Sequence, residues 1–157
     1  MKILVMSDTH GKVKPVKKLL DQYKGEVKTV LHLGDGARDL LQLKSEYPEM
    51  DFVAVAGNCD FAAIAQQERI LTLGSKRILL THGHNHSVGV NNQRLMYYAL
   101  ELKMDACLFG HTHFPEILEY ESVFLMNPGS LGNPRGNAPS YGLLTINESI
   151  TGELMYL

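Results

Sequence analysis

Side chains that can bind metals occur at five separate places along this chain, and each place follows an apolar run. The runs span residues 3–6, 30–33, 52–56, 78–80 and 106–109. The side chains that follow them are Asp8 and His10, Asp35, Asn58, His82, and finally His111 and His113. Short apolar runs bounded by turn-forming residues are typical of strands buried on both faces, as in parallel sheets. Because an α/β sheet gathers distant residues at the ends of its strands, we expect these seven side chains to meet in one crevice.

The donor types in this group indicate which metals it suits. Carboxylate and amide oxygens are mixed with imidazole nitrogens, and no thiolate belongs to the group. Such a mixture suits manganese, iron or zinc better than calcium, and it argues against a structural zinc site. Seven ligands exceed the needs of one tetrahedral ion, so we expect two ions. Asp35, which stands alone after its strand, is the natural bridge between them.

Two neighbouring ions are well suited to the hydrolysis of phosphate esters. Ions about 3.5–4 Å apart hold a hydroxide near neutral pH and neutralise the oxygens of a phosphoryl group during in-line displacement. The spacings Asp8-x-His10 and His111-x-His113 place two side chains on one side of an extended segment. We therefore expect each pair to point into the crevice from an extended backbone.

The rest of the pattern predicts the elements that position these residues. Apolar residues recur at helical spacing over residues 14–23, 38–47 and 91–102, and residues 62–67 are a further short candidate helix. The second half of the chain contains strands joined by turns, over residues 69–73, 77–80, 116–120, 123–126, 141–146 and 153–156. We predict an α/β fold in which two mixed sheets pack face to face with helices outside, as one domain over residues 1–157.

Composition and charge exclude several classes of protein. With 157 residues, 45% hydrophobic and 20% charged, the chain has the composition of an ordinary globular protein. No apolar segment approaches the roughly 20 residues that cross a bilayer, and the chain begins with a strand rather than a secretion signal. The net charge of −2 gives no support to a nucleic-acid partner. We expect a cytoplasmic protein with no membrane partner, and a homodimer or higher homo-oligomer stays open.

Five blocks of the chain, taken in order, resemble the calcineurin-like metallophosphoesterases. The blocks are Asp8-x-His10, Gly34-Asp35, Gly57-Asn58, His82 and Gly110-His111-x-His113. Residues 57–60 and 127–130 look most like the compact bacterial and archaeal phosphodiesterases of that superfamily. The resemblance implies a four-layer αββα sandwich and a metal-dependent phosphoesterase, most simply a phosphodiesterase that acts on a small phosphate ester.

The resemblance also implies how the seven ligands divide between two divalent ions. One ion would be held by Asp8, His10, Asp35 and His113. The other would be held by Asp35, Asn58, His82 and His111. A hydroxide bridging the ions would attack phosphorus in line, so Asp35, Asn58 and His82 would act in catalysis through the metals. Manganese is the favoured ion, and nickel, iron, zinc and magnesium stay open.

Four further residues are candidates for substrate contact: Cys59, His84, Arg38 and Arg135. Many members of the family have histidine at the position of Cys59, where it is thought to protonate the leaving oxygen or bind the phosphate. A thiol is a weak hydrogen-bond donor and a poor general acid. We therefore expect diesters with activated leaving groups to be better substrates than monoesters with poor leaving groups. His32 lies within a predicted strand, and we expect it to be a packed core residue.

Other functions remain open on the sequence alone. A phosphomonoesterase and a nucleotide pyrophosphatase would use the same metal chemistry. The same fold also serves as a non-catalytic, protein-binding scaffold in the retromer coat. Such scaffolds have lost some of the metal ligands, whereas all seven positions are present in this chain, which favours an enzyme.

Overall fold

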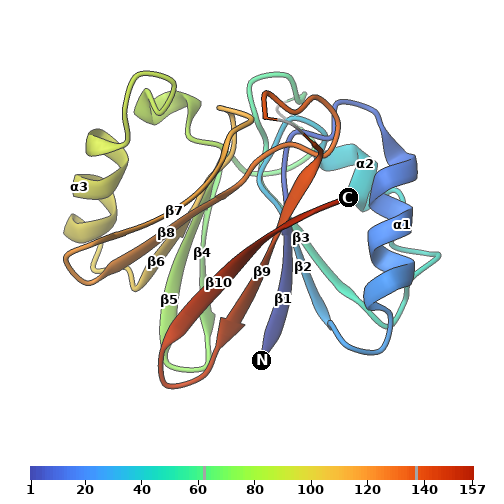
Figure 1. The fold of residues 1–157 in the computed structure, drawn as a ribbon, viewed down its shortest axis with the longest axis horizontal. Helices are drawn as coiled ribbons and strands as arrows, with labels where there is room; N and C mark the ends of the chain where they lie inside the picture. The colour runs from blue at the N-terminus through green and yellow to red at the C-terminus, as the bar shows by residue number, and fades with distance from the viewer. Residues whose placement is uncertain (62, 137) are drawn as a thin grey trace.

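The computed structural model, which describes residues 1–61, 63–136 and 138–157, contains two five-stranded mixed sheets that pack face to face (Figure 1). The first sheet has the order β10-β9-β1-β2-β3 and the second the order β4-β5-β6-β8-β7. The strands of the first are β1 (Lys2–Met6), β2 (Thr29–His32), β3 (Asp51–Ala54), β9 (Ser140–Ile146) and β10 (Ile150–Tyr156). Those of the second are β4 (Glu68–Leu73), β5 (Lys76–Thr81), β6 (Ala106–Leu108), β7 (Pro115–Tyr120) and β8 (Val123–Pro128). In each sheet three parallel strands are bordered by antiparallel ones.

Helices cover the two outer faces. Helices α1 (Val13–Tyr23) and α2 (Ala37–Leu41) lie on the first sheet, and α3 (Gln93–Glu101) lies on the second (Figure 1). A short 3₁₀ helix, η1 (His84–His86), follows β5. The predicted four-layer αββα arrangement is therefore confirmed. Among the described residues, none of the helices is long and apolar enough to cross a membrane.

Alternation of side chains along the strands explains the layers. Ile3 and Val5 on β1 point between the sheets, where they pack in one cluster with Ile78 and Leu80 of β5. Leu4, the neighbour of both, points the other way and packs under α1. Successive residues of a strand face opposite sides, so a strand with both faces buried is apolar at every position. That is why the continuous apolar runs in the sequence indicated these strands.

Two of the predicted elements differ from the structure, and a third falls partly outside the described residues. The helix expected over residues 38–47 is helical only to Leu41, and turns continue the chain to residue 46. Leu43 and Tyr47 are nevertheless buried, because these turns coil the chain tightly enough to keep them against the first sheet. The strand expected over residues 52–56 ends at Ala54. In the helix expected over residues 62–67, position 62 lies outside the described residues, and residues 63–67 form no helix.

The loops that carry the proposed ligands meet at one edge of the sandwich. They follow β1, β2 and β3 of the first sheet and β5 and β6 of the second. In Figure 1 this edge is at the top, where the loop after β1 and the loop between β6 and β7 approach each other from the two sheets. The two sheets therefore contribute to a single site.

Candidate metal centre

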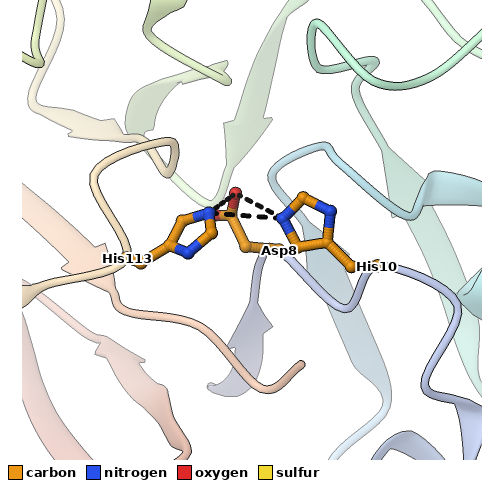
Figure 2. A group of neighbouring side chains, drawn as sticks. All are labelled: Asp8, His10 and His113. Carbon is orange, nitrogen blue, oxygen red and sulfur yellow. Dashed lines mark hydrogen bonds and ion pairs between the residues drawn. The ribbon is translucent and has the colours of Figure 1, made fainter. Parts of the chain in front are cut away.

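Two buried carboxylates and three imidazoles converge at this edge. Asp8 and Asp35 are almost inaccessible to solvent. His113 Nε2 lies 3.1 Å from Asp8 Oδ1, and His82 Nε2 lies 3.4 Å from Asp35 Oδ2. His10 Nε2 lies 3.2 Å from His113 Nε2. Figure 2 shows Asp8 and His10, from the loop after β1, and His113, from the loop between β6 and β7, pointing toward one another.

The remaining distances in this cluster are also short. His10 Nε2 lies 3.8 Å from Asp8 Oδ1 and 3.9 Å from Asp35 Oδ2, and His82 Nε2 lies 3.9 Å from Asp8 Oδ1. Ligand atoms bound tetrahedrally at 2.0–2.1 Å from an ion are about 3.3 Å apart. The five side chains thus have the spacing of ligands around a divalent cation, and each carboxylate faces more than one imidazole.

Hydrogen bonds to the backbone fix the orientation of two of the imidazoles. His82 Nδ1 lies 2.7 Å from the carbonyl oxygen of Leu33, and His113 Nδ1 lies 2.6 Å from that of Asn133. A carbonyl oxygen can only accept, so each Nδ1 carries the proton. In the neutral ring, the Nε2 lone pair then faces the carboxylates. Metal-binding histidines commonly have this arrangement, because the second hydrogen bond sets both tautomer and ring orientation.

Two buried atoms of the cluster lack hydrogen bonds. While His82 and His113 are neutral, their Nε2 atoms present lone pairs rather than protons to the carboxylates, and Asp8 Oδ1 and His82 Nε2 then have no hydrogen-bonding partner within the described part of the chain. Protonation of either ring would supply a hydrogen bond to a carboxylate. A buried polar atom without a partner costs about 1–3 kcal/mol, so such atoms usually mark the place of an ion, a water or a ligand. The donor set of carboxylates and imidazoles fits a divalent ion such as manganese, iron or zinc.

The electrostatics of the cluster favour positive charge. Burial alone raises the pKa of Asp35, but the hydrogen bond and charge of His82 outweigh it and hold this pKa well below its usual range. Burial lowers the pKa of His82, but hydrogen bonding to Asp35 and the charges of both aspartates raise it overall. The hydrogen bond with Asp8 raises the pKa of His113. Protons and divalent cations therefore compete for the same atoms.

The backbone at five of the seven proposed ligands is left-handed. The φ angles are 53° at Asp8, 46° at His10, 53° at Asp35, 71° at His111 and 63° at His113. Residues other than glycine seldom adopt this conformation, and when they do so together they mark functional sites. The expectation of an extended backbone at Asp8-x-His10 and His111-x-His113 is therefore wrong. Tight turns, rather than strand alternation, direct both side chains of each pair inward.

Asp60 positions two of these loops, and the sequence analysis missed it. Its Oδ1 accepts from the backbone N–H groups of Gly36 at 3.0 Å and Ala37 at 3.1 Å. Its Oδ2 accepts from the N–H of Gly57 at 2.9 Å. One carboxylate thus joins the loop of Asp35 to the loop of Asn58. Asn58 and Asp60 are turn-forming residue types, so the sequence indicated a turn here, but the contacts of Asp60 with Gly36 and Ala37 are not local in sequence.

Asn127 positions the loop of His111 and His113. Its buried Nδ2 donates to the carbonyl oxygen of Gly110 at 2.9 Å and to Thr112 Oγ1 at 2.9 Å. The nearby Ser130 Oγ donates to the carbonyl oxygen of Asp8 at 2.7 Å. Residues 127–130 therefore hold ligand loops from both sheets in place.

Two glycines allow the ligand loops to pack closely. A Cβ atom at Gly57 would lie 2.1 Å from Asp35 Oδ1, and one at Gly110 would lie 2.1 Å from Ser7 Oγ. Contacts this short leave no room for any side chain. The glycines that precede Asn58 and His111 are therefore required by the approach of neighbouring loops.

His111 and His84 lie beside His82. The ring centroid of His111 is 5.1 Å from that of His82, and its backbone N–H donates to Asp8 Oδ2 at 3.1 Å. The ring centroid of His84 is 5.5 Å from that of His82, and its buried Nδ1 has no partner in the described residues. Burial, followed by the charge of His82, lowers the pKa of both His84 and His111. Both rings thus border the cluster in their neutral form.

Asn58 and Cys59 occupy the outer side of the cluster. Asn58 is exposed, and its Nδ2 lies 3.5 Å from Cys59 Sγ rather than at the carboxylates. The sulfur of Cys59 belongs to a group with His10 and Asp35 whose ligand atoms lie within 4.8 Å of one another. The Cys59 N–H donates to Asp35 Oδ1 at 2.7 Å. Hydrogen bonding to Asp35, together with burial, raises the pKa of the Cys59 thiol to about 11.

A family model for the calcineurin-like phosphoesterase superfamily domain matches residues 1–149. The chain belongs to this superfamily. The probable metallophosphoesterase YsnB of Bacillus subtilis is 34% identical over 154 residues, which cover 96% of this chain and 88% of YsnB. Phosphodiesterase YfcE of Escherichia coli is 30% identical over 168 residues, covering 92% of this chain and 87% of YfcE. The chain thus fits the compact, YfcE-like metallophosphoesterases, a family that uses divalent metals.

Solved structures share the fold of this metallophosphoesterase. A predicted phosphoesterase from Streptococcus pneumoniae has a TM-score of 0.82 and 34% identity, covering 99% of this chain and 88% of that one. Vps29 from Entamoeba histolytica, crystallised with zinc, has a TM-score of 0.78 and 26% identity, covering 99% of each chain. A protein of this fold therefore binds a divalent metal ion.

Among the described residues, two cavities of this metallophosphoesterase border the cluster, and a larger one lies elsewhere. Arg38 is exposed and lines a cavity of about 380 Å³ together with Asp35 and Cys59. Arg135 is exposed and lines a cavity of about 560 Å³ together with His111. The larger cavity, of about 950 Å³, is formed around α3 and contains none of the proposed ligands.

Two other histidines lie outside the cluster. His32 is fully buried, with Nε2 at 3.1 Å from Thr9 Oγ1, in agreement with its expected core position. His86 lines the large cavity near α3 and pairs with Glu68, 2.5 Å from its Oε1. Neither residue faces the metal-binding atoms.

Proposed function

We propose that this metallophosphoesterase is a phosphodiesterase that uses two divalent metal ions. The observation that carries the proposal is the meeting of Asp8 and Asp35 with the Nε2 atoms of three imidazoles, at separations of 3.1–3.9 Å. The relative that is named a phosphodiesterase supports the choice of reaction. The mixed oxygen and nitrogen ligands favour manganese as the ion.

In this proposal the ligands form two sets that share Asp35. Asp8, His10, Asp35 and His113 hold one ion, and Asp35, Asn58, His82 and His111 hold the other. The position of Asp35 supports this division, since its Oδ2 faces His10 of the first set and His82 of the second. Asn58 has to turn away from Cys59 to complete the second set. When bound, the two ions would supply a hydroxide nucleophile and neutralise charge on the phosphate.

The residues of the chain prepare this site in four ways. The buried carboxylates provide negative charge that attracts the cations. Backbone hydrogen bonds keep the lone pairs of His82 and His113 directed at the cluster. The exposed guanidinium groups of Arg38 and Arg135 attract an anionic substrate toward the two cavities. His84, neutral at ordinary pH, can donate a hydrogen bond to a phosphate oxygen.

Cys59 favours diesters with good leaving groups. Its thiol, with a pKa of about 11, stays protonated near neutral pH and transfers its proton poorly. General acid catalysis is most effective when the pKa of the acid lies near the working pH. Esters whose leaving group departs without being protonated should therefore be the better substrates.

Metal analysis combined with steady-state kinetics tests the proposal. The wild-type protein and the Asp35→Asn variant are reconstituted with Mn²⁺, Ni²⁺, Mg²⁺ or Zn²⁺, and bound metal is measured by mass spectrometry. We expect two ions per chain and hydrolysis of bis(4-nitrophenyl) phosphate by the wild type. Asp35→Asn should lose metal and reduce kcat/KM by more than about 100-fold. Asp51→Asn, an exposed aspartate on β3, is the control, and full activity in Asp35→Asn would exclude the bridging role.

The similarity to Vps29 makes a protein-binding scaffold the second candidate function. The presence of all seven ligand positions favours hydrolysis instead. Failure to bind stoichiometric Mn²⁺, together with no hydrolysis of an activated diester, would establish the scaffold as the better assignment.

A further inference from the structure

Exposed phenylalanines border the proposed metal site on two sides. Phe61 is 87% exposed and Phe114 is 51% exposed. Phe61 lines the smaller of the two cavities beside the cluster, in company with His10 and Asp35. Phe114 lines the other, in company with His111. An isolated exposed apolar residue needs no explanation, but two aromatic residues in cavities that contain metal ligands indicate contact with substrate.

Each cavity combines its phenylalanine with an arginine. Arg38 shares the first cavity with Phe61, and Arg135 shares the second with Phe114. Neither guanidinium forms an ion pair with any residue in the described ranges. Each cavity thus offers a planar apolar face and a cation that is available to an anionic ligand.

The two cavities belong to different sheets, and the metal ligands lie between them. The cavity of Phe61 is formed by the loops after β1, β2 and β3 of the first sheet. The cavity of Phe114 is formed mainly by the segments that follow β5, β6 and β8 of the second. Volumes of about 380 and 560 Å³ both fall in the range of small-molecule sites, about 300–1,000 Å³. The two ester groups of a phosphodiester point away from phosphorus in different directions, so one can enter each cavity.

We propose that the substrate is a phosphodiester in which both ester groups are planar and aromatic, one stacked on Phe61 and the other on Phe114. This inference rests on the proposed phosphodiesterase function and specifies the class of its substrate. Aryl groups and nucleosides have the required planar faces, whereas alkyl groups leave both phenylalanines exposed to water. Stacking depends little on the hydrogen-bonding pattern of the ring, so different bases are accepted similarly.

Two substrates with the same leaving group test this inference. Bis(4-nitrophenyl) phosphate has aromatic groups on both sides, and methyl 4-nitrophenyl phosphate has one. We expect the wild type to have a KM about fivefold lower for the first. Phe61→Ala and Phe114→Ala should each raise the KM of the bis-aryl diester by about fivefold. With methyl 4-nitrophenyl phosphate, only one of the two alanine variants should raise the KM. The variant that does so identifies the cavity that holds the nitrophenyl leaving group.

Further variants separate stacking from other effects. Phe61→Tyr and Phe114→Tyr keep a planar face and should retain the wild-type KM. Phe61→Leu and Phe114→Leu keep an apolar side chain without a planar face, and should behave like the alanine variants. Tyr97→Ala removes an aromatic side chain that is 60% exposed on α3, away from the ligands, and should change neither KM.

Calorimetry with diphenyl phosphate and dimethyl phosphate gives a measure that does not require turnover. The manganese-loaded protein should bind diphenyl phosphate more tightly, and each alanine variant should reduce the difference. If both nitrophenyl substrates are hydrolysed with equal KM, and the phenylalanine variants change neither, the inference is wrong and the proposed function stands. If neither is hydrolysed by metal-loaded protein, the proposed function is wrong, and the calorimetric comparison still decides whether Phe61 and Phe114 bind aromatic groups.

Discussion

His32 is a neutral, fully buried imidazole that connects the loops of two proposed metal ligands, Asp8 and Asp35. Its Nδ1 accepts from the N–H of Gly34, so its Nε2 carries the proton and donates to Thr9 Oγ1. Thr9 in turn donates to Asp39 Oδ2 at 2.6 Å. Burial lowers the pKa of His32 to about 4, although the charge of Asp8 opposes this shift. Protonation would therefore break the packing beneath the site.

This pKa predicts a loss of stability in mild acid. Unfolded histidine has a pKa near 6.5, so between pH 6.5 and 4 His32 binds a proton in the unfolded chain but not in the folded one. The free energy of unfolding should fall through that window by up to about 3 kcal/mol. Urea denaturation with a chelator present measures it. His32→Gln, which keeps a donor toward Thr9, should make the slope smaller by the contribution of His32, and a slope equal to that of wild type would contradict the role of His32.

Cys59 should decide the balance between monoesters and diesters. In Cys59→His, an imidazole with a pKa near neutral replaces a thiol with a pKa of about 11. We expect the ratio of kcat/KM for phenyl phosphate, a monoester whose leaving group needs a proton, over bis(4-nitrophenyl) phosphate to rise by about tenfold or more. Cys59→Ser, which also removes the thiol but adds no proton donor of suitable pKa, should leave the ratio near that of wild type. A ratio that is the same in the histidine and serine variants would show that proton donation is not the cause.

At the scale of elements, the function depends on loops that are fastened to one another after their strands end. Asp60→Ala should leave the N–H groups of Gly36, Ala37 and Gly57 without their acceptor. We expect a loss of about 2–3 kcal/mol in unfolding free energy. Metal affinity should fall as well, since Asp35 and Asn58 lie on the loops that Asp60 joins.

Denaturation and metal titration of the same preparations check this prediction. Asp51→Ala removes an exposed carboxylate at the start of β3 and should leave both quantities unchanged. Asp60→Asn keeps one acceptor oxygen and should lie between wild type and Asp60→Ala. Wild-type metal affinity in Asp60→Ala would show that the ligand loops do not need this connection.

The elements that the sequence predicted well are those whose pattern has only one structural explanation. Runs such as residues 3–6 and 106–109 are apolar at every position because both faces of the strand are buried. The helix predicted over residues 38–47 is longer than the helix in the structure, because successive turns bury Leu43 and Tyr47 as effectively as a helix would. The left-handed backbone at Asp8 and His10 could not be predicted, since a spacing of two residues is common to strands and turns. The exposure of Phe61 and Phe114 depends on which loops surround them, and this is not local information.

At the scale of the whole molecule, the two sheets share a core and the proposed metal site. Ile3 and Val5 of the first sheet pack against Ile78 and Leu80 of the second. The proposed ligands also come from both sheets, with Asp8 and Asp35 from the first and His82 and His113 from the second. That the chain is a single domain stays a prediction, and we expect one cooperative unfolding transition when all probes are compared.

Metal binding should stabilise the folded chain, and more so at higher pH. With Mn²⁺ at 100 times its Kd, the gain is about 2.7 kcal/mol, or roughly 5–10 °C in Tm. The raised pKa values of His82 and His113 mean that both hold protons at a pH above the usual histidine range. As pH falls from 8 to 6 these protons compete with the metal, so the increase in Tm caused by Mn²⁺ should become smaller.

Scanning calorimetry with Mn²⁺ and with chelator, at both pH values, measures this effect. Asp35→Asn should lose most of the shift in Tm. An equal shift in Asp35→Asn would show that the metal stabilises the protein from another site. A shift that does not change with pH would show that protons on His82 and His113 do not compete with it.

The left-handed backbone at five of the proposed ligands also bears on how this protein can evolve. Such conformations cost about 1–3 kcal/mol each in residues other than glycine, and least in aspartate. In a lineage that no longer needed hydrolysis, replacement of His10, His111 or His113 by glycine would relieve the strain and would no longer be selected against. Loss of these ligands would then raise the free energy of unfolding, and their recovery would lower it. The most stable sequence for this fold is therefore not the sequence that keeps all seven proposed metal ligands.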